Sequence, residues 1–232
     1  MDTLLEAKGL KKSYGNVAAL KGIDLRLMSG RIVGLLGPNG SGKTTLIKIA
    51  CRLLQPTEGQ ILIDGEAPGP VSKSKIAYLP DKDFLPDWMK TKHLLQFYED
   101  FYADFDRNRA LEMLSSLEIP ENMTLRKMSK GTKEKMQLIL TMSRRARIYL
   151  LDEPIAGVDP AARDYILRTI ISNYEENALV MISTHLIADV ESVLDEAVFL
   201  KKGEIVLHKP TDQIREETGK SVDEYFREVF KC

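Results

Sequence analysis

Residues 37–45 read GPNGSGKTT, the segment of the chain whose residue types and spacing most clearly predict chemistry. They fit the pattern G-x-x-x-x-G-K-[ST] at Gly37, Gly42, Lys43 and Thr44. In this pattern successive backbone N–H groups point at phosphate oxygens, the lysine reaches the terminal phosphates, and the threonine hydroxyl is a ligand for Mg²⁺. The alternative is a chance glycine-rich turn, but the loop lies between an apolar run and a helical pattern, as a nucleotide-binding loop requires. The predicted nucleotide contacts are Gly37, Pro38, Asn39, Gly40, Ser41, Gly42, Lys43, Thr44 and Thr45.

Two adjacent carboxylates, Asp152 and Glu153, end the sequence IYLLDE at residues 148–153. A nucleotide bound with Mg²⁺ needs a carboxylate to hold the metal and a group to handle the attacking water. Asp152, together with Thr44, is the predicted metal ligand, and Glu153 is the predicted group for the water. Adjacent carboxylates also occur in exposed turns, so this prediction depends on the phosphate loop (residues 37–45) of the same chain.

Hydrophobic periodicity predicts the elements that position these motifs. Alternation at Ile23–Leu27 predicts a half-buried strand, and further strands are predicted at 32–36, 61–63, 76–79, 148–151, 179–183, 198–200 and 205–207. A helix is predicted from Thr44 to Leu54, with Leu46, Ile49, Ala50, Leu53 and Leu54 on its apolar face. Residues 84–147 show only helical spacing, which predicts a helical lobe inserted into an α/β body.

Composition narrows the class of protein. Lys and Arg number 33 against 34 Asp and Glu in 232 residues, a net charge of −1 that disfavours a protein whose main task is coating nucleic acid. Two cysteines, Cys51 and Cys232, cannot form a disulfide framework and suit a reducing compartment. The apolar runs fall far short of the ~20 residues that cross a bilayer, and the N-terminus lacks a signal-peptide pattern. We therefore expect a cytoplasmic protein whose connection to a membrane comes through a partner.

With these motifs in place, the chain resembles the ATP-binding subunit of an ABC transporter from about residue 4 to residue 208. The resemblance implies an α/β fold, a P-loop NTPase body with an N-terminal antiparallel β-subdomain and an inserted helical subdomain. It also implies one domain over residues 1–232. In that domain 1–82 and 148–210 form the nucleotide-binding body, 83–147 the helical subdomain and 211–232 a short tail.

The resemblance implies roles for three further residues. Tyr14 matches the aromatic residue that stacks on adenine, although an ordinary edge-strand tyrosine is the alternative. Asp159 matches an aspartate that contacts the opposite subunit, and its alternative is a turn residue before Pro160. His185, directly after ALVMIST, matches a catalytic histidine that contacts the γ-phosphate, whereas His93 and His208 have no such context.

Two positions depart from the family pattern. Residues 128–132, the signature segment, read MSKGT where the family has LSGGQ, so Ser129 and Gly131 are kept as expected contacts of a γ-phosphate held by a second subunit. Lys130 adds a charge that either favours phosphate or is simply solvated. Asp81 stands where the family usually has glutamine; it is a candidate metal ligand, or it alters how nucleotide occupancy is communicated to the partner.

The neighbouring residues 84–89, FLPDWM, match the groove that receives a helix of the membrane subunit, and packing inside the helical lobe is the equal alternative. The tail SVDEYFREVF and the signature variant resemble subunits of ABC-2-type exporters. The expected function is ATP hydrolysis, with ATP and Mg²⁺ as cofactors, that powers export through an integral membrane subunit, with a second ATP-binding subunit completing each site and no nucleic acid bound. The alternative is a non-transport ABC-type ATPase in iron–sulfur assembly or nucleic-acid maintenance, for which the basic run 125–147 is the main support.

Overall fold

The computed structural model of the protein describes residues 2–158 and 160–231. In the described part the order of the β-strands is β1 (Thr3–Tyr14), β2 (Val17–Met28), β3 (Arg31–Leu36), β4 (Glu58–Ile63), β5 (Ile76–Leu79), β6 (Ile148–Asp152), β7 (Leu179–Thr184), β8 (Glu196–Lys201) and β9 (Glu204–Pro210). The helices are α1 (Lys43–Ala50), α2 (Pro70–Ser74), α3 (Thr91–Phe101), α4 (Arg107–Ser116), α5 (Lys130–Met142), α6 (Pro160–Asn173), α7 (Ile187–Val190), α8 (Thr211–Thr218) and α9 (Val222–Val229), with a short 3₁₀ turn at Leu125–Lys127. The predicted α/β fold class is confirmed.

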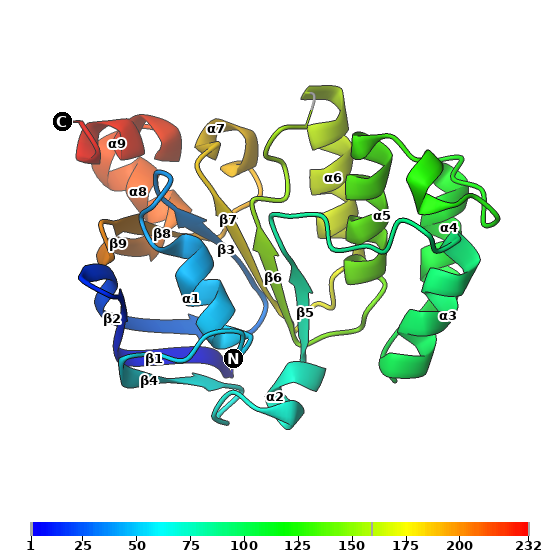
Figure 1. The fold of residues 1–232 in the computed structure, drawn as a ribbon. Helices are drawn as coiled ribbons and strands as arrows, with labels where there is room; N and C mark the ends of the chain where they lie inside the picture. The colour runs from blue at the N-terminus through cyan, green and yellow to red at the C-terminus, as the bar shows by residue number, and fades with distance from the viewer. Residues whose placement is uncertain (1, 159, 232) are drawn as a thin grey trace.

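Two sheets form the body (Figure 1). One has three antiparallel strands in the order β2-β1-β4, and the other has six strands in the order β5-β6-β7-β3-β8-β9. In the six-stranded sheet of the described residues, β5, β6, β7, β3 and β8 run parallel and β9 is antiparallel to β8. Every residue of β6 and β7 is buried, as expected for parallel strands covered on both faces.

The larger sheet separates two hydrophobic clusters. The cluster on one face joins α1 and the antiparallel sheet through residues such as Leu46, Ile47 and Leu150. The cluster on the other face joins the helices α3–α7 and the tail through residues such as Leu151, Ile170 and Phe199. In Figure 1 the antiparallel sheet and α1 therefore lie to one side of the parallel strands, and α5 and α6 lie to the other with α3 and α4 beyond them.

The helical content predicted for residues 84–147 is confirmed by α3, α4 and α5. The helix predicted from Thr44 to Leu54 is too long, because α1 ends at Ala50. Arg52 adopts a left-handed conformation with φ 52°, which reverses the chain. Leu53 then lies exposed at 54% instead of on the apolar face of the helix.

Candidate nucleotide site

Parallel strands bring the candidate residues to one edge of the sheet. The phosphate loop follows β3, Asp152 ends β6, His185 follows β7 and Asp81 lies two residues after β5. The carboxyl ends of these strands face the same way, and ligands of open α/β sheets bind at that edge. A cavity of about 550 Å³ opens there, and its lining residues are Ala19, Asn39, Gly40, Ser41, Gly42, Lys43, Thr44, Thr45, Asp81, Glu153, Ala156 and His185.

The phosphate loop is held tightly against the rest of the body. At Gly42 the backbone has φ 112°, and a Cβ atom there would lie 2.7 Å from the Ala19 carbonyl oxygen, so only glycine fits without strain. Lys43 is 5% exposed, and its Nζ donates to the carbonyl oxygens of Gly37 at 2.7 Å and Pro38 at 3.4 Å. The buried hydroxyl of Ser41 has no hydrogen-bond partner in the described part of the chain. The loop is thus preformed around a cationic centre.

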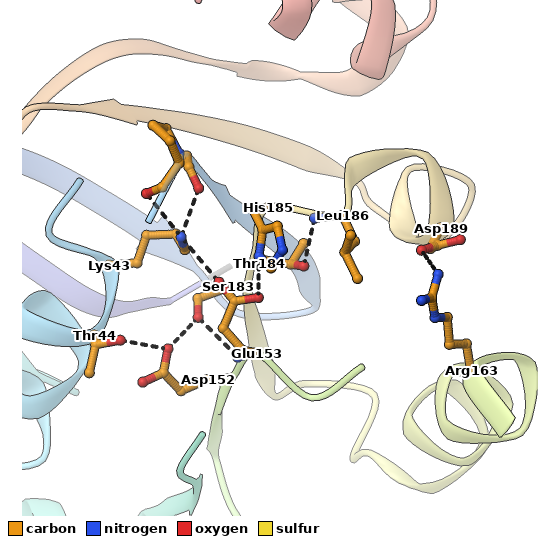
Figure 2. A network of polar contacts seen from close by, with 12 residues as sticks. Lys43, Thr44, Asp152, Glu153, Arg163, Ser183, Thr184, His185, Leu186 and Asp189 are labelled. Atoms are coloured by element: carbon orange, nitrogen blue, oxygen red, sulfur yellow. Dashed lines mark hydrogen bonds and ion pairs between the residues drawn. The ribbon is translucent and has the colours of Figure 1, made fainter. Parts of the chain in front are cut away.

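Asp152 and its neighbours form an oxygen-rich corner below the loop (Figure 2). The hydroxyls of Thr44 and Ser183 donate to Asp152 Oδ1 at 3.1 and 2.5 Å. The second oxygen, Oδ2, is buried without a partner among the described residues. Burial raises the pKa of the Asp152 carboxyl, and the bonds from Ser183 and Thr44 partly offset this effect.

This corner fits Mg²⁺, because a hydroxyl and an unpartnered carboxylate oxygen are hard ligands of the kind that this ion prefers. Within residues 2–158 and 160–231 no three His, Cys, Asp or Glu side chains gather as a complete metal site. Mg²⁺ in phosphate sites is commonly held by one or two carboxylates together with substrate oxygens and water. The donor set of Thr44 and Asp152 matches that arrangement.

Glu153 connects the loop to the end of β7. Its φ of 51° is an uncommon left-handed conformation for a residue with a side chain, and its backbone N–H donates to Ser183 at both the carbonyl oxygen, 3.0 Å, and the hydroxyl, 3.2 Å. The carboxylate then lies 3.1 Å from Lys43 Nζ through Oε1 and 3.0 Å from His185 Nδ1 through Oε2. Figure 2 shows Lys43, Glu153 and His185 converging from three elements.

Tyr14, the predicted contact of adenine, lies outside the lining of the cavity, as do Gly37, Pro38 and Asp152. Tyr14 ends β1 opposite Val17 and is exposed, with Lys12 Nζ 5.2 Å from its ring centroid. It belongs to the same hairpin as Ala19, which does line the cavity. Asp159 falls outside the described residues.

The signature segment lies at the start of α5. Ser129 is the N-cap of this helix, and its hydroxyl accepts a hydrogen bond from the Thr132 N–H at 3.1 Å. Gly131 has open space around it, and the Lys130 side chain is 84% exposed. These residues form no part of the cavity of their own chain.

Ser183 belongs to no predicted motif, although this residue bonds both Asp152 and the backbone of Glu153. The register that pairs Asp152 with Ser183 across β6 and β7 brings them together. Its position two residues before His185, at the end of an apolar run, is the only local signal.

Comparisons with known proteins identify the family of the chain. Residues 20–156 match the family described as ABC transporter, and the chain belongs to that family. It is 31% identical over 217 residues to the ABC transporter ATP-binding protein YtrB of Bacillus subtilis (strain 168), covering 92% of this chain and 74% of that protein. It is 27% identical over 220 residues to the SkfA peptide export ATP-binding protein SkfE of the same organism, covering 92% of each chain.

A solved ATP-binding subunit of an ABC transporter matches with a TM-score of 0.88 and 30% identity, over 99% of this chain and all of that one. The function that this membership shows is that of the ATP-binding subunit, an ATPase that serves transport. In the described residues no helix combines the length and the apolar character needed to cross a bilayer.

Proposed function

We propose that this subunit hydrolyses Mg²⁺-ATP at the cavity beside the phosphate loop, in a site completed by a second ATP-binding subunit. Hydrolysis drives export through a separate integral membrane subunit, which holds the chain at the inner face of the membrane. The observation that carries the proposal is the convergence of Lys43, Thr44, Asp152, Glu153 and His185 at one edge of the sheet.

Binding of the nucleotide falls to the phosphate loop. Lys43 Nζ lies at the phosphate loop, where it donates to the Gly37 carbonyl oxygen and pairs with Glu153, and its ammonium group is the proposed contact of the β- and γ-phosphates. Thr44 and Asp152 would hold Mg²⁺, which neutralises charge on the phosphates when bound. Tyr14, on the hairpin that also carries Ala19, is the proposed contact of the adenine ring.

Glu153 is the proposed acceptor for a proton of the attacking water. Its Oε2 is paired with His185 and its Oε1 with Lys43, so the carboxylate has a defined direction toward the cavity. His185 would then contact the γ-phosphate while it orients Glu153. Asp81, which lines the same cavity, is proposed as an additional metal ligand.

The second subunit would contribute its signature segment. Ser129, Lys130 and Gly131 at the start of α5 are exposed and do not line the nucleotide cavity of their own chain, which suits contacts with a γ-phosphate held by another copy. Asp159 is the proposed contact between the two subunits.

The membrane subunit would dock where β5 meets the helical lobe. A cleft of about 380 Å³ lies there, lined by aromatic and aliphatic residues including Leu53, Phe84 and Tyr98. Of the FLPDWM residues, Leu85 is buried and Met89 packs against the core, whereas Phe84 and Trp88 are exposed. An amphipathic cytoplasmic helix of the membrane subunit matches this mixture of pocket and exposed aromatic anchors.

The basic run at residues 125–147 gives little support to nucleic-acid binding. Five of its eight cations are paired with carboxylates, namely Lys130, Lys133, Arg144, Arg145 and Arg147. The neighbouring carboxylates offset part of the positive charge on which attraction of a phosphate backbone depends. The transporter names of the relatives give the non-transport alternative no support either.

Mg²⁺ titration of ATP hydrolysis tests the site. Asp81→Asn is expected to weaken the dependence on Mg²⁺ and lower turnover, and unchanged Mg²⁺ affinity and turnover would remove Asp81 from the ligand set. Thr44→Ala and Asp152→Asn are expected to abolish Mg²⁺-dependent hydrolysis. If both variants hydrolyse ATP like the wild type, the proposed site is wrong.

A further inference from the structure

Two segments that carry predicted catalytic side chains leave the cavity in different directions. The chain after Glu153 turns through Ile155, which is fully buried, and Val158 toward α6. The chain after His185 turns into α7, whose Ile187 and Val190 are buried. Glu153 and His185 contact each other directly, so their alignment depends on where these two segments lie relative to one another.

One side chain on α6 bonds both segments. Arg163 Nε donates to the Val158 carbonyl oxygen at 3.0 Å, and Arg163 Nη1 lies 2.7 Å from Asp189 Oδ2 on α7. Figure 2 shows the Arg163–Asp189 pair beyond His185 and Leu186, and neither residue of the pair lines the cavity. The Arg163 and Asp189 side chains are 26% and 35% exposed, so the pair is partly shielded from solvent.

Helix α7 has a second, independent anchor at its C-cap, Glu191. The Asp223 N–H donates to Glu191 Oε2 at 3.0 Å, and Arg215 Nη2 donates to the Glu191 carbonyl oxygen at 3.0 Å. Together with the burial of Ile187 and Val190, these bonds keep α7 folded without Arg163. The Arg163 bonds therefore fix where α7 lies relative to the segment after Glu153, and α7 does not need them to stay folded.

We propose that Arg163 is a positioning residue for ATP hydrolysis. It holds the segment after Glu153 against the helix after His185, and so keeps the Glu153–His185 contact aligned with the nucleotide. The inference rests on the proposed function, since it assigns Arg163 to the alignment of those two side chains. A fork of several N–H donors is required, because one group must reach a carbonyl and a carboxylate at once.

Arg163→Met removes both bonds and keeps the aliphatic stem, and Asp189→Asn removes only the ion pair to α7. We expect single-turnover hydrolysis of Mg²⁺-ATP to fall about tenfold in Arg163→Met and less in Asp189→Asn. ATP affinity and the melting temperature are expected to stay near the wild-type values, because neither residue lines the cavity and α7 keeps its second anchor. Arg107→Met is the matched control, because Arg107 pairs with Glu99 at 2.9 Å between α3 and α4 with similar exposures of 30% and 43%.

Hydrogen exchange reports the contact itself without depending on ATPase activity. Peptides covering residues 186–190 are expected to exchange faster in both variants, and those covering 155–158 only in Arg163→Met. A hydrolysis rate in Arg163→Met equal to that of Arg107→Met would overturn the proposal, and so would unchanged exchange. Parallel losses of rate, ATP affinity and melting temperature would assign Arg163 a merely structural role. If the wild type does not hydrolyse ATP, the proposed function fails, while the exchange data still decide whether Arg163 holds the two segments together.

Discussion

Replacement of Glu153 by glutamine separates nucleotide binding from hydrolysis. The glutamine side chain has the same shape and keeps an amide oxygen that can accept from either Lys43 or His185. Lys43 retains the carbonyl oxygens of Gly37 and Pro38, at 2.7 and 3.4 Å, as further acceptors. The phosphate loop is therefore expected to keep its conformation in Glu153→Gln.

The hydrolytic rate is expected to fall much further than binding. A positioned general base contributes about 10²–10⁴-fold to a rate, which corresponds to roughly 3–5 kcal/mol of activation free energy. Loss of the carboxylate also removes a negative charge 3.1 Å from Lys43, the side chain that faces the phosphates. The Kd for ATP is therefore expected to stay within a few-fold of the wild-type value or to become lower.

Equilibrium ATP binding, phosphate release and size-exclusion chromatography with Mg²⁺-ATP measure these effects on one preparation. We expect Glu153→Gln to bind ATP, to hydrolyse it scarcely and to accumulate as a dimer. Glu66→Gln is the control, since Glu66 also pairs with a lysine, Lys75 at 3.2 Å, but lies outside the cavity. Hydrolysis by Glu153→Gln at the rate of this control would refute the assignment of Glu153.

Three further predictions concern the loop, the lobe and the docking surface. Gly42→Ala is expected to destabilise the fold by about 1–3 kcal/mol and to weaken ATP binding, because the φ of 112° and the Ala19 carbonyl leave no room for Cβ. Thermal unfolding would measure the loss of stability and ATP titration the loss of binding. A wild-type melting temperature would contradict the steric argument. Hydrogen bonds from the Arg109 N–H and from Arg145 hold the pKa of Asp106 below its usual range, so its contribution to stability is present above the unfolded-state pKa and is lost as pH falls through the folded-state pKa. Asp106→Asn keeps the N-cap but should show a smaller loss of melting temperature on acidification than the wild type, and an equal loss would count against this linkage. Trp88→Ala is expected to leave the melting temperature unchanged, because the Trp88 side chain is 72% exposed. The same variant is expected to co-purify less with the membrane subunit. Normal assembly with that subunit would remove Trp88 from the docking surface.

The arrangement of the nucleotide cavity could be predicted because each motif is local and follows a buried strand. The phosphate loop follows β3, Asp152 ends β6 and His185 follows β7, and these largely apolar parallel strands of five or six residues are fully buried except for Arg31 at the start of β3. Parallel strands end at one edge, so the side chains that follow them meet there. The catalytic roles assigned to these residues, and the domain boundaries, stay predictions.

The end of α1 could not be predicted from apolar spacing. Leu53 and Leu54 continue the helical period, but their N–H groups bond back to the Lys48 carbonyl oxygen after the left-handed turn at Arg52. A pattern of apolar side chains does not report the backbone conformation of one intervening arginine. The same limit applies to residues 84–89, where the structure separates buried Leu85 from exposed Trp88.

Sequence patterns also do not predict which side chains of distant segments contact each other. Ser183 bonds Asp152 because β6 and β7 pair in one register, and Arg163 reaches Asp189 because α6 lies beside α7. The residues that approach one another in this way are 26 to 31 positions apart in the chain, with no shared motif. Neither pair could be inferred without the fold.

Co-purification of this chain with an integral membrane subunit, with ATPase activity measured with and without that subunit, is the most direct test of its role as the ATPase of an exporter. We expect a complex containing two ATP-binding subunits whose Mg²⁺-dependent hydrolysis changes when the membrane subunit is present and is lost in Glu153→Gln. A chain that hydrolyses ATP but never associates with a membrane subunit would contradict the account of this protein as the ATPase of an exporter.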